Sequence, residues 1–180
     1  GGMLTVLVVS AASVGWAAEK ALPGEWLYPV KTSWNEEVRM AMALTPEAKA
    51  MWAVQRIQRR LQETERLTVH NMLTTPATTQ ITNQLKQNAA NLQAHVRQLS
   101  NTGKSQIAAE VSGQLEATLR AHQRIFSEVA TLDLTLARSD GVRRIATAVG
   151  AHLSTAFDDR SAAEANLQFE SPRQVQTAAT

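Results

Sequence analysis

The chain has 180 residues, no cysteine and a formal net charge of +2. Without thiols it cannot form disulfides, thiolate nucleophiles or cysteine metal sites. Charges of both signs are mixed along the chain, with no lysine-rich arm and no basic stripe between aromatics, so we expect no nucleic-acid partner. Aromatic residues make up 4%, and the apolar content rests on Ala, Leu, Val, Ile and Met, which favours an all-α fold.

Residues 1–20 are expected to be an apolar anchor or the remnant of a signal peptide. The stretch from Met3 to Ala18 carries no charge, but it is shorter than the ~20 residues that span a bilayer. It can be the C-terminal part of a transmembrane helix, a signal peptide cleaved near Gly15 and Ala17, or a buried first helix of a soluble domain. Trp16 stands where an aromatic belt would mark the membrane surface.

Residues 21–32 are expected to be a connector rich in proline and glycine. Pro23-Gly24 is a turn dipeptide, and Pro29 prevents a helix from running through the segment. Three large side chains are expected to pack on the following helices as a hydrophobic lid and not to bind a ligand: Trp26, Leu27 and Tyr28.

Residues 33–168 show a helical periodicity and are predicted to form an up-and-down antiparallel bundle, because short connections join long amphipathic helices. Thr45-Pro46-Glu47 is a strong start signal, and Ser139-Asp140-Gly141 is interpreted as a break before the last helix. The helices are expected at about 33–43, 46–73, 79–99, 104–137 and 141–167. Residues 169–180 are predicted to be a disordered tail.

Each predicted helix has an apolar face. The first uses Trp34, Val38 and Met42, the second Ala50, Val54, Ile57, Leu61 and Thr64, and the third Ile81, Leu85, Ala89, Leu92, Val96 and Leu99. The fourth follows nearly a strict heptad: Ala108, Val111, Leu115, Thr118, His122, Ile125, Val129, Leu132 and Leu136. The last uses Val142, Ile145, Val149, Leu153 and Phe157.

The second helix also carries a charged face. It consists of Arg56, Arg59, Arg60, Glu63 and Arg66. Because both signs are present, we expect a solvated, internally paired surface in preference to a face that meets anionic lipid heads.

The candidate metal residues are His122 and His152. Folding the helices back on each other brings them, together with His70, to similar heights, and both lie on predicted seams. Two histidines are an incomplete ligand set, and no Glu-x-x-His or His-Glu-x-x-His motif occurs, so ordinary structural histidines are favoured over a metal site. Replacing both is expected to leave metal affinity unchanged.

Several short motifs resemble a bacterial family built on a domain of unknown function. They are Leu22-Pro23-Gly24, Leu27-Tyr28-Pro29-Val30-Lys31, Pro46-Glu47-Ala48-Lys49-Ala50 and Arg60-Leu61-Gln62-Glu63, and the resemblance covers about residues 18–67. It implies an exported or membrane-anchored helical protein on the extracytoplasmic side of the bacterial cytoplasmic membrane. That family offers no established catalytic residues to carry over.

The resulting expectation is a non-enzymatic, membrane-tethered extracytoplasmic domain that acts in protein interaction or envelope sensing. Its partners would be the membrane, through the N-terminal segment, and a protein. No cofactor is expected, since the chain has no glycine-rich phosphate loop, nucleophile elbow or paired carboxylates. The alternatives are a periplasmic metal or stress sensor that uses the seam histidines and an enzyme with a site between helices.

Overall fold

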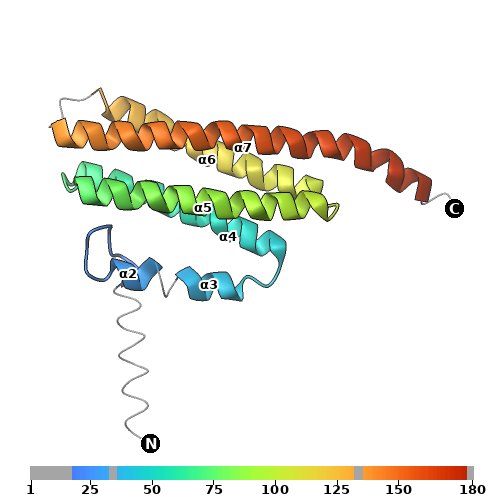
Figure 1. The fold of residues 1–180 in the computed structure, drawn as a ribbon, viewed down its shortest axis with the longest axis horizontal. Helices are drawn as coiled ribbons and strands as arrows, with labels where there is room; N and C mark the ends of the chain where they lie inside the picture. Colours follow the sequence, from blue (N-terminus) through green and yellow to red (C-terminus); the bar gives the residue numbers. More distant parts are fainter. Residues whose placement is uncertain (1–17, 33–35, 132–135, 178–180) are drawn as a thin grey trace, which may run out of the picture. The chain divides into compact units, whose positions relative to one another are not determined.

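All the secondary structure that the computed structural model describes, over residues 18–32, 36–131 and 136–177, is helical (Figure 1). The chain divides into two compact units, Gly1–Ala43 and Leu44–Thr180. The expected apolar segment falls outside the described residues except for its last three positions. Within the described residues no helix is both long and apolar enough to cross a membrane.

The first unit contains a tight turn and two short helices, α2 (Tyr28–Val30) and α3 (Glu36–Met42). Gly24 has φ +96°, a conformation that glycine adopts without a Cβ penalty. The turn is closed by the amide of Glu25, which donates to the carbonyl of Leu22 (3.0 Å), and by the amide of Tyr28, which donates to the carbonyl of Glu25 (3.1 Å). The predicted connector is therefore an ordered turn that leads into a helix.

The hydrophobic lid and the apolar face of α3 were only partly predicted. Tyr28 is fully buried, but Trp26 is 83% exposed, so the expectation that it packs inside is wrong. Val38 and Met42 are also exposed, whereas Glu36 is buried. At 100° per residue Val38 lies about 200° from Glu36, so the buried side of α3 is opposite to the predicted one. Trp34 lies outside the described residues.

The second unit contains four long helices: α4 (Pro46–Val69), α5 (Thr75–Asn101), α6 (Ser105–Val129) and α7 (Leu136–Thr177). The hydroxyls of Thr45 and Thr74 cap α4 and α5 by accepting from the amides of Ala48 (3.1 Å) and Ala77 (3.3 Å). A proline follows each cap at the first turn, where its missing N–H costs nothing. The start predicted for α4 is confirmed, while α5 begins about four residues earlier than predicted.

Ion pairs and close contacts between helices establish the topology. Within the second unit, consecutive long helices run antiparallel (Figure 1), as predicted for the all-α bundle. Lys104 pairs with Glu47 and His122 with Glu65, so α4 and α6 run parallel to each other. Gln93 likewise contacts Asp159, and Gly141 lies against Thr78. The bundle thus consists of two antiparallel hairpins, α4–α5 and α6–α7, packed so that α5 lies beside α7 and α4 beside α6.

The predicted seams of α4 and α5 form the core: every member except Ala89 is buried. The heptad predicted for α6 is correct only in its first half, because Leu119 and Phe126 are buried while Ile125 is 41% exposed. The buried positions keep a seven-residue spacing from Ser105 through Ser112 and Leu119 to Phe126, so this line of the stripe lies one residue beyond the predicted Thr118 and Ile125. In α7 the buried positions Val142, Val149, Ala156 and Ala163 also keep a seven-residue spacing, so Ala156 is buried and the predicted Phe157 is exposed.

The boundary between α6 and α7 also differs from the prediction. Helix α6 ends at Val129 and not near residue 137, and α7 already begins at Leu136. The Ser139-Asp140-Gly141 sequence lies inside the first turns of α7 and does not break it. At its other end α7 is helical to Thr177, where an irregular tail was predicted from residue 169.

The charged face of α4 is internally paired as expected, but part of it is buried where a solvated surface was expected. Arg60 and Glu63 are buried, and Nη1 of Arg60 lies 3.3 Å from Oε2 of Glu63 and 3.4 Å from Oε1 of Gln84. A buried guanidinium requires such partners because desolvating an unpaired charge is expensive. The guanidinium of Arg59 lies over the ring of the buried Trp52, 5.1 Å from its centroid, and covers its face. Of the five residues of this face, Arg60 and Glu63 are buried, Arg56 and Arg59 are half-buried and Arg66 is exposed.

Candidate functional site

The structure gives His122 a carboxylate as its partner. Its Nδ1–H donates to Oε1 of Glu65 on α4 (2.6 Å), and its ring stacks on Phe126 with centroids 6.3 Å apart. The imidazole is buried. An ionised carboxylate only accepts, so this bond fixes the ring orientation and leaves Nε2 as the remaining nitrogen.

His152 lies at a similar level of the bundle, as predicted, because nearby Gly150 faces the side chain of Gln123 on α6. Burial lowers the pKa of His152 below its ordinary value, since desolvation disfavours the charged imidazolium. In the part of the chain that the structure describes, no group of three or more His, Cys, Asp or Glu side chains could hold a metal ion. Metal binding by His122 and His152 stays a prediction.

A different feature offers a binding geometry: an open groove of about 710 Å³ between α5 and α7. We call it the α5–α7 groove. One wall comes from the first half of α5 and the other from the first turns of α7. It is lined by Thr78, Thr79, Thr82, Asn83, Asp140, Arg143, Arg144, Thr147, Ala148 and Ala151.

Close approach of the two helices at one end shapes this groove. A Cβ atom added to Gly141 would lie 2.8 Å from Oγ1 of Thr78 and 3.4 Å from a methyl of Leu73. Thr78 cannot easily turn away, because its hydroxyl donates to the carbonyl of Thr74 (2.9 Å). Glycine therefore lets α7 start against the N-terminal turn of α5, and the small threonine and alanine side chains beyond this point leave the groove open.

Three of the four threonine hydroxyls in the groove, those of Thr78, Thr82 and Thr147, donate their protons within their own helices. Thr82 donates to the carbonyl of Thr78 (2.8 Å) and Thr147 to that of Arg143 (2.9 Å). These side chains consequently present methyl groups and acceptor lone pairs. Hydrogen-bond donors for a ligand are the hydroxyl of Thr79, the amide of Asn83 and the guanidinium groups.

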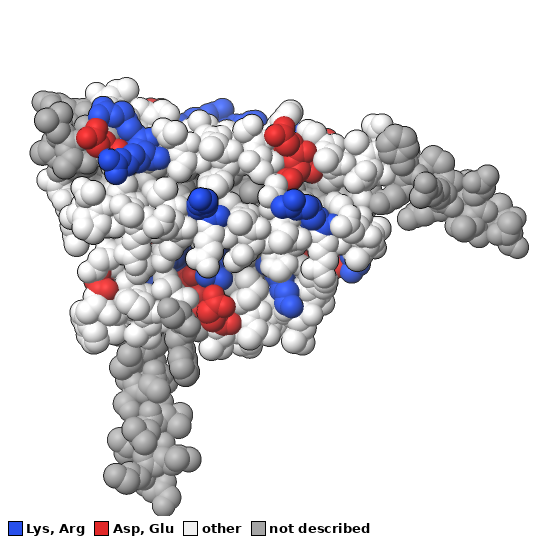
Figure 2. Space-filling view, in the orientation of Figure 1, with Lys and Arg blue, Asp and Glu red and all other residues white. Residues whose placement is uncertain are grey.

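Two arginines stand at the α7 edge of the groove. Arg143 is paired with Asp140 on the preceding turn, whereas Arg144 is exposed and makes no ion pair within the described ranges. On the face shown in Figure 2 most of the surface is uncharged, and a group of basic side chains with an acidic one beside it lies over the start of α7. The groove therefore combines an apolar floor with an excess of one positive charge among its three charged side chains.

Sequence reasoning missed this groove. A signal was present, since Thr78, Thr79, Thr82 and Asn83 form a short polar cluster on one helix, but nothing in the sequence shows that α7 runs beside it. That neighbour relation depends on how the two hairpins stack. Interpreting Gly141 as a helix break also hid the close contact that defines one end of the groove.

Comparisons with known proteins place the chain in a family. The family described as "Domain of unknown function (DUF5667)" matches residues 20–132. No curated protein and no solved structure matches the chain. The matched range includes the ordered turn, α3, α4, α5 and α6, and it extends well beyond the residues 18–67 that carried the resemblance. Helix α7 lies outside it. With more than half of its length matched, the chain belongs to the DUF5667 family, a domain of unknown function.

Proposed function

We propose that this chain is a non-enzymatic interaction module, tethered to the extracytoplasmic face of a bacterial cytoplasmic membrane by its N-terminal segment, and that it binds an acidic segment of a partner protein in the α5–α7 groove. The observation that carries the proposal is the groove itself. It has a volume of about 710 Å³, a mostly apolar lining and two arginines.

The lining favours binding over catalysis. Thr78, Thr82 and Thr147 donate to backbone carbonyls. The lining residues include no histidine, and their one carboxylate that could act as a base, Asp140, is paired with Arg143. A nucleophilic hydroxyl needs such a base within hydrogen-bond reach. What the groove offers instead is methyl surface, acceptor oxygens and guanidinium donors.

The same inventory points to the class of partner. Guanidinium groups bind carboxylates through paired hydrogen bonds, and Arg144 is available for such a contact. Threonine methyls together with Ala148 and Ala151 offer a shallow apolar floor for small side chains. An acidic helical or extended segment with small residues on one side fits both features.

The location rests on the sequence. The stretch from Met3 to Ala18 is uncharged and ends just before the ordered turn, which is the order expected for a tether followed by a globular domain. Fusing alkaline phosphatase to the C-terminus tests this part, since the reporter is active only outside the cytoplasm. An inactive fusion that is nevertheless expressed would contradict it.

Site-specific crosslinking in the producing bacterium tests the groove. A photoreactive amino acid is placed at Thr79, which lines the groove, or at Gln87, an exposed control position on the same helix. We expect a discrete protein adduct from position 79 and none from position 87. Adding Arg144→Glu to the position-79 chain should abolish the adduct. Equal adducts from both positions, or an adduct that survives the charge reversal, would show that the groove is not the binding surface.

A further inference from the structure

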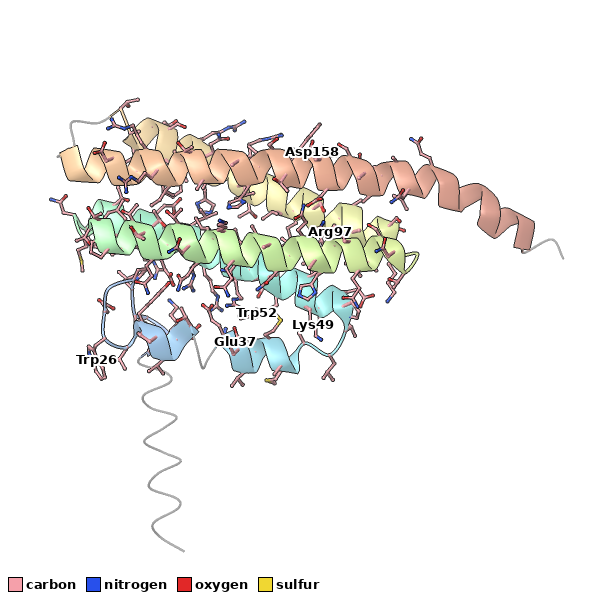
Figure 3. All side chains as sticks on the ribbon, in the orientation of Figure 1. Trp26, Glu37, Lys49, Trp52, Arg97 and Asp158 are labelled. Atoms are coloured by element: carbon pink, nitrogen blue, oxygen red, sulfur yellow. The ribbon has the colours of Figure 1, made fainter. Side chains whose placement is uncertain are left out.

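The most exposed tryptophan of the described residues stands at the tip of an ordered turn. Trp26 is 83% exposed, and Figure 3 shows its indole projecting outward from the loop before α2. A tryptophan buries more apolar surface than most side chains when it finds a partner. An indole that stays exposed on an ordered turn therefore indicates that this side chain has a binding partner outside the described residues.

The turn that carries Trp26 is rigidly built. The amide of Leu22 donates to the carboxylate of Glu25 (2.7 Å), in addition to the two backbone bonds that close the turn. Behind it, the buried ammonium of Lys31 donates to the carbonyl of Ala21 (3.1 Å) and lies over the ring of the buried Tyr28, 5.8 Å from its centroid. These hydrogen bonds and the contact between Lys31 and Tyr28 form a framework that holds the indole of Trp26 outward.

This framework is tied to the end of the apolar stretch. The amide of Ala21 donates to the carbonyl of Ala18 (2.9 Å), and Lys31 binds the same short segment. Trp26 follows Ala18 by only eight residues, so even a fully extended chain would keep it within about 29 Å of that point. The closed turn makes the distance shorter.

We infer that Trp26 is an interfacial membrane anchor, whose indole inserts among the lipid headgroups beside the tether and fixes the orientation of the first unit. The inference rests on the proposed membrane tether. Tryptophan prefers the bilayer interface because its ring is apolar while its N–H stays hydrogen-bonded in the wet headgroup region. Lys20 is exposed in the same unit and adds a positive charge that favours anionic headgroups.

Fluorescence in vesicles tests the inference directly. Trp16→Phe, Trp34→Phe and Trp52→Phe together leave Trp26 as the single tryptophan of the full chain. The chain is reconstituted into phosphatidylcholine–phosphatidylglycerol vesicles whose acyl chains carry bromine at a shallow or a deep position. We expect the Trp26 emission to shift to shorter wavelength and to be quenched more by shallow than by deep bromine.

Three outcomes would overturn it, and they are distinguishable. If the chain floats with the vesicles but Trp26 keeps a water-like, unquenched emission, the tether stands and the anchor is wrong. If the chain does not float with vesicles, the tether fails and the anchor fails with it. If the blue shift occurs without vesicles and grows with protein concentration, Trp26 contacts a second copy of the chain.

A second variant covers the case in which the triple substitution unfolds the protein, since Trp52 is buried. The chain contains no cysteine, so Trp26→Cys gives a unique thiol for an environment-sensitive dye in an otherwise unchanged chain. Ala41→Cys, exposed in the same unit, is the matched control. A dye signal that responds to vesicles at position 26 and not at position 41 supports the anchor, and equal responses contradict it.

Discussion

Arg160 of α7 donates from Nε to Oε2 of Glu116 on α6 at 2.7 Å, and the other oxygen of the same carboxylate accepts from Arg120. Glu116 is buried, with only 8% of its side chain exposed. Arg160 also contacts Glu164 one turn further along α7 (2.8 Å) and lies over the ring of Phe157, 5.6 Å from its centroid. This cluster joins the second half of α7 to α6.

Replacing Glu116 by Gln is expected to destabilise the fold by about 1–3 kcal/mol, because a charge-assisted acceptor is lost from a buried site. Glu164→Gln is the matched control: its side chain is 51% exposed, so the loss should stay below about 1 kcal/mol. Urea unfolding followed by circular dichroism measures both. Equal losses would mean that the buried carboxylate does not organise the cluster.

Phe126→Ala should cost about 3–5 kcal/mol, since it empties a fully buried position of α6. Ile125→Ala, at the neighbouring position that the heptad had placed in the core, should cost about 1 kcal/mol or less, because that side chain is 41% exposed. Thermal and urea denaturation of the two variants decide between the two registers. A larger loss for Ile125→Ala would favour the heptad.

Gly141→Ala is expected to destabilise the bundle although alanine is the better helix former by about 1 kcal/mol. The new methyl would meet the fixed hydroxyl of Thr78, and overpacking of this kind costs about 1–3 kcal/mol. At Gly113 the added methyl meets only the flexible side chain of Arg160 at 3.4 Å. Gly113→Ala should therefore raise the urea midpoint while Gly141→Ala lowers it, and a gain in both would show that the helices can move apart.

The lowered pKa of His152 predicts a loss of stability in mild acid. Burial favours the neutral ring in the folded state, so below the ordinary value of 6.5 the unfolded chain binds more protons. The stabilising contribution of the neutral His152 ring is complete above about pH 6.5 and is lost as the pH falls toward the lowered pKa. In His152→Gln the melting temperature should fall less between about pH 8 and 5 than in the parent or in the non-titrating control Ser154→Gln. An unchanged pH slope would refute this.

The pair between Glu47 and Lys104 also loses stability on acidification, but over a lower pH range. The hydrogen bond from Lys104, with the backbone and Thr45, lowers the pKa of Glu47 to about 2. Its stabilising contribution is present above the ordinary carboxyl value of 4.5 and is lost as the pH falls toward 2. The difference in melting temperature between the parent and Glu47→Gln should shrink over that range and should also shrink in high salt, because the pair is exposed.

The fold was predictable where local signals agree with each other. The caps at Thr45 and the seams of α4 and α5 follow from residue types and spacing alone, and the structure confirms them. The boundary near Gly141 was not predictable, because the same residue serves as a helix breaker in isolation and as a close-contact residue in a packed helix. Only the neighbouring Thr78 distinguishes the two roles, and it lies more than sixty residues away in the chain.

The candidate site shows a similar division. His122 was placed on a buried seam correctly, but its partner Glu65 lies on a helix whose rotation relative to α6 no periodicity fixes. The α5–α7 groove depends on two helices that are neither consecutive nor antiparallel. Sequence patterns describe the face of each helix, whereas the pairing of faces is decided by the packing of all four.

The family match ends at residue 132, before α7, although α7 packs against both α5 and α6. Leu85, Leu92 and Leu119 are buried in a bundle whose fourth helix lies beyond the shared range. A fragment that ends at residue 132 would expose hydrophobic surfaces of α5 and α6 to solvent and would be prone to aggregate. The boundary of the family match at residue 132 therefore falls between two helices of one compact unit.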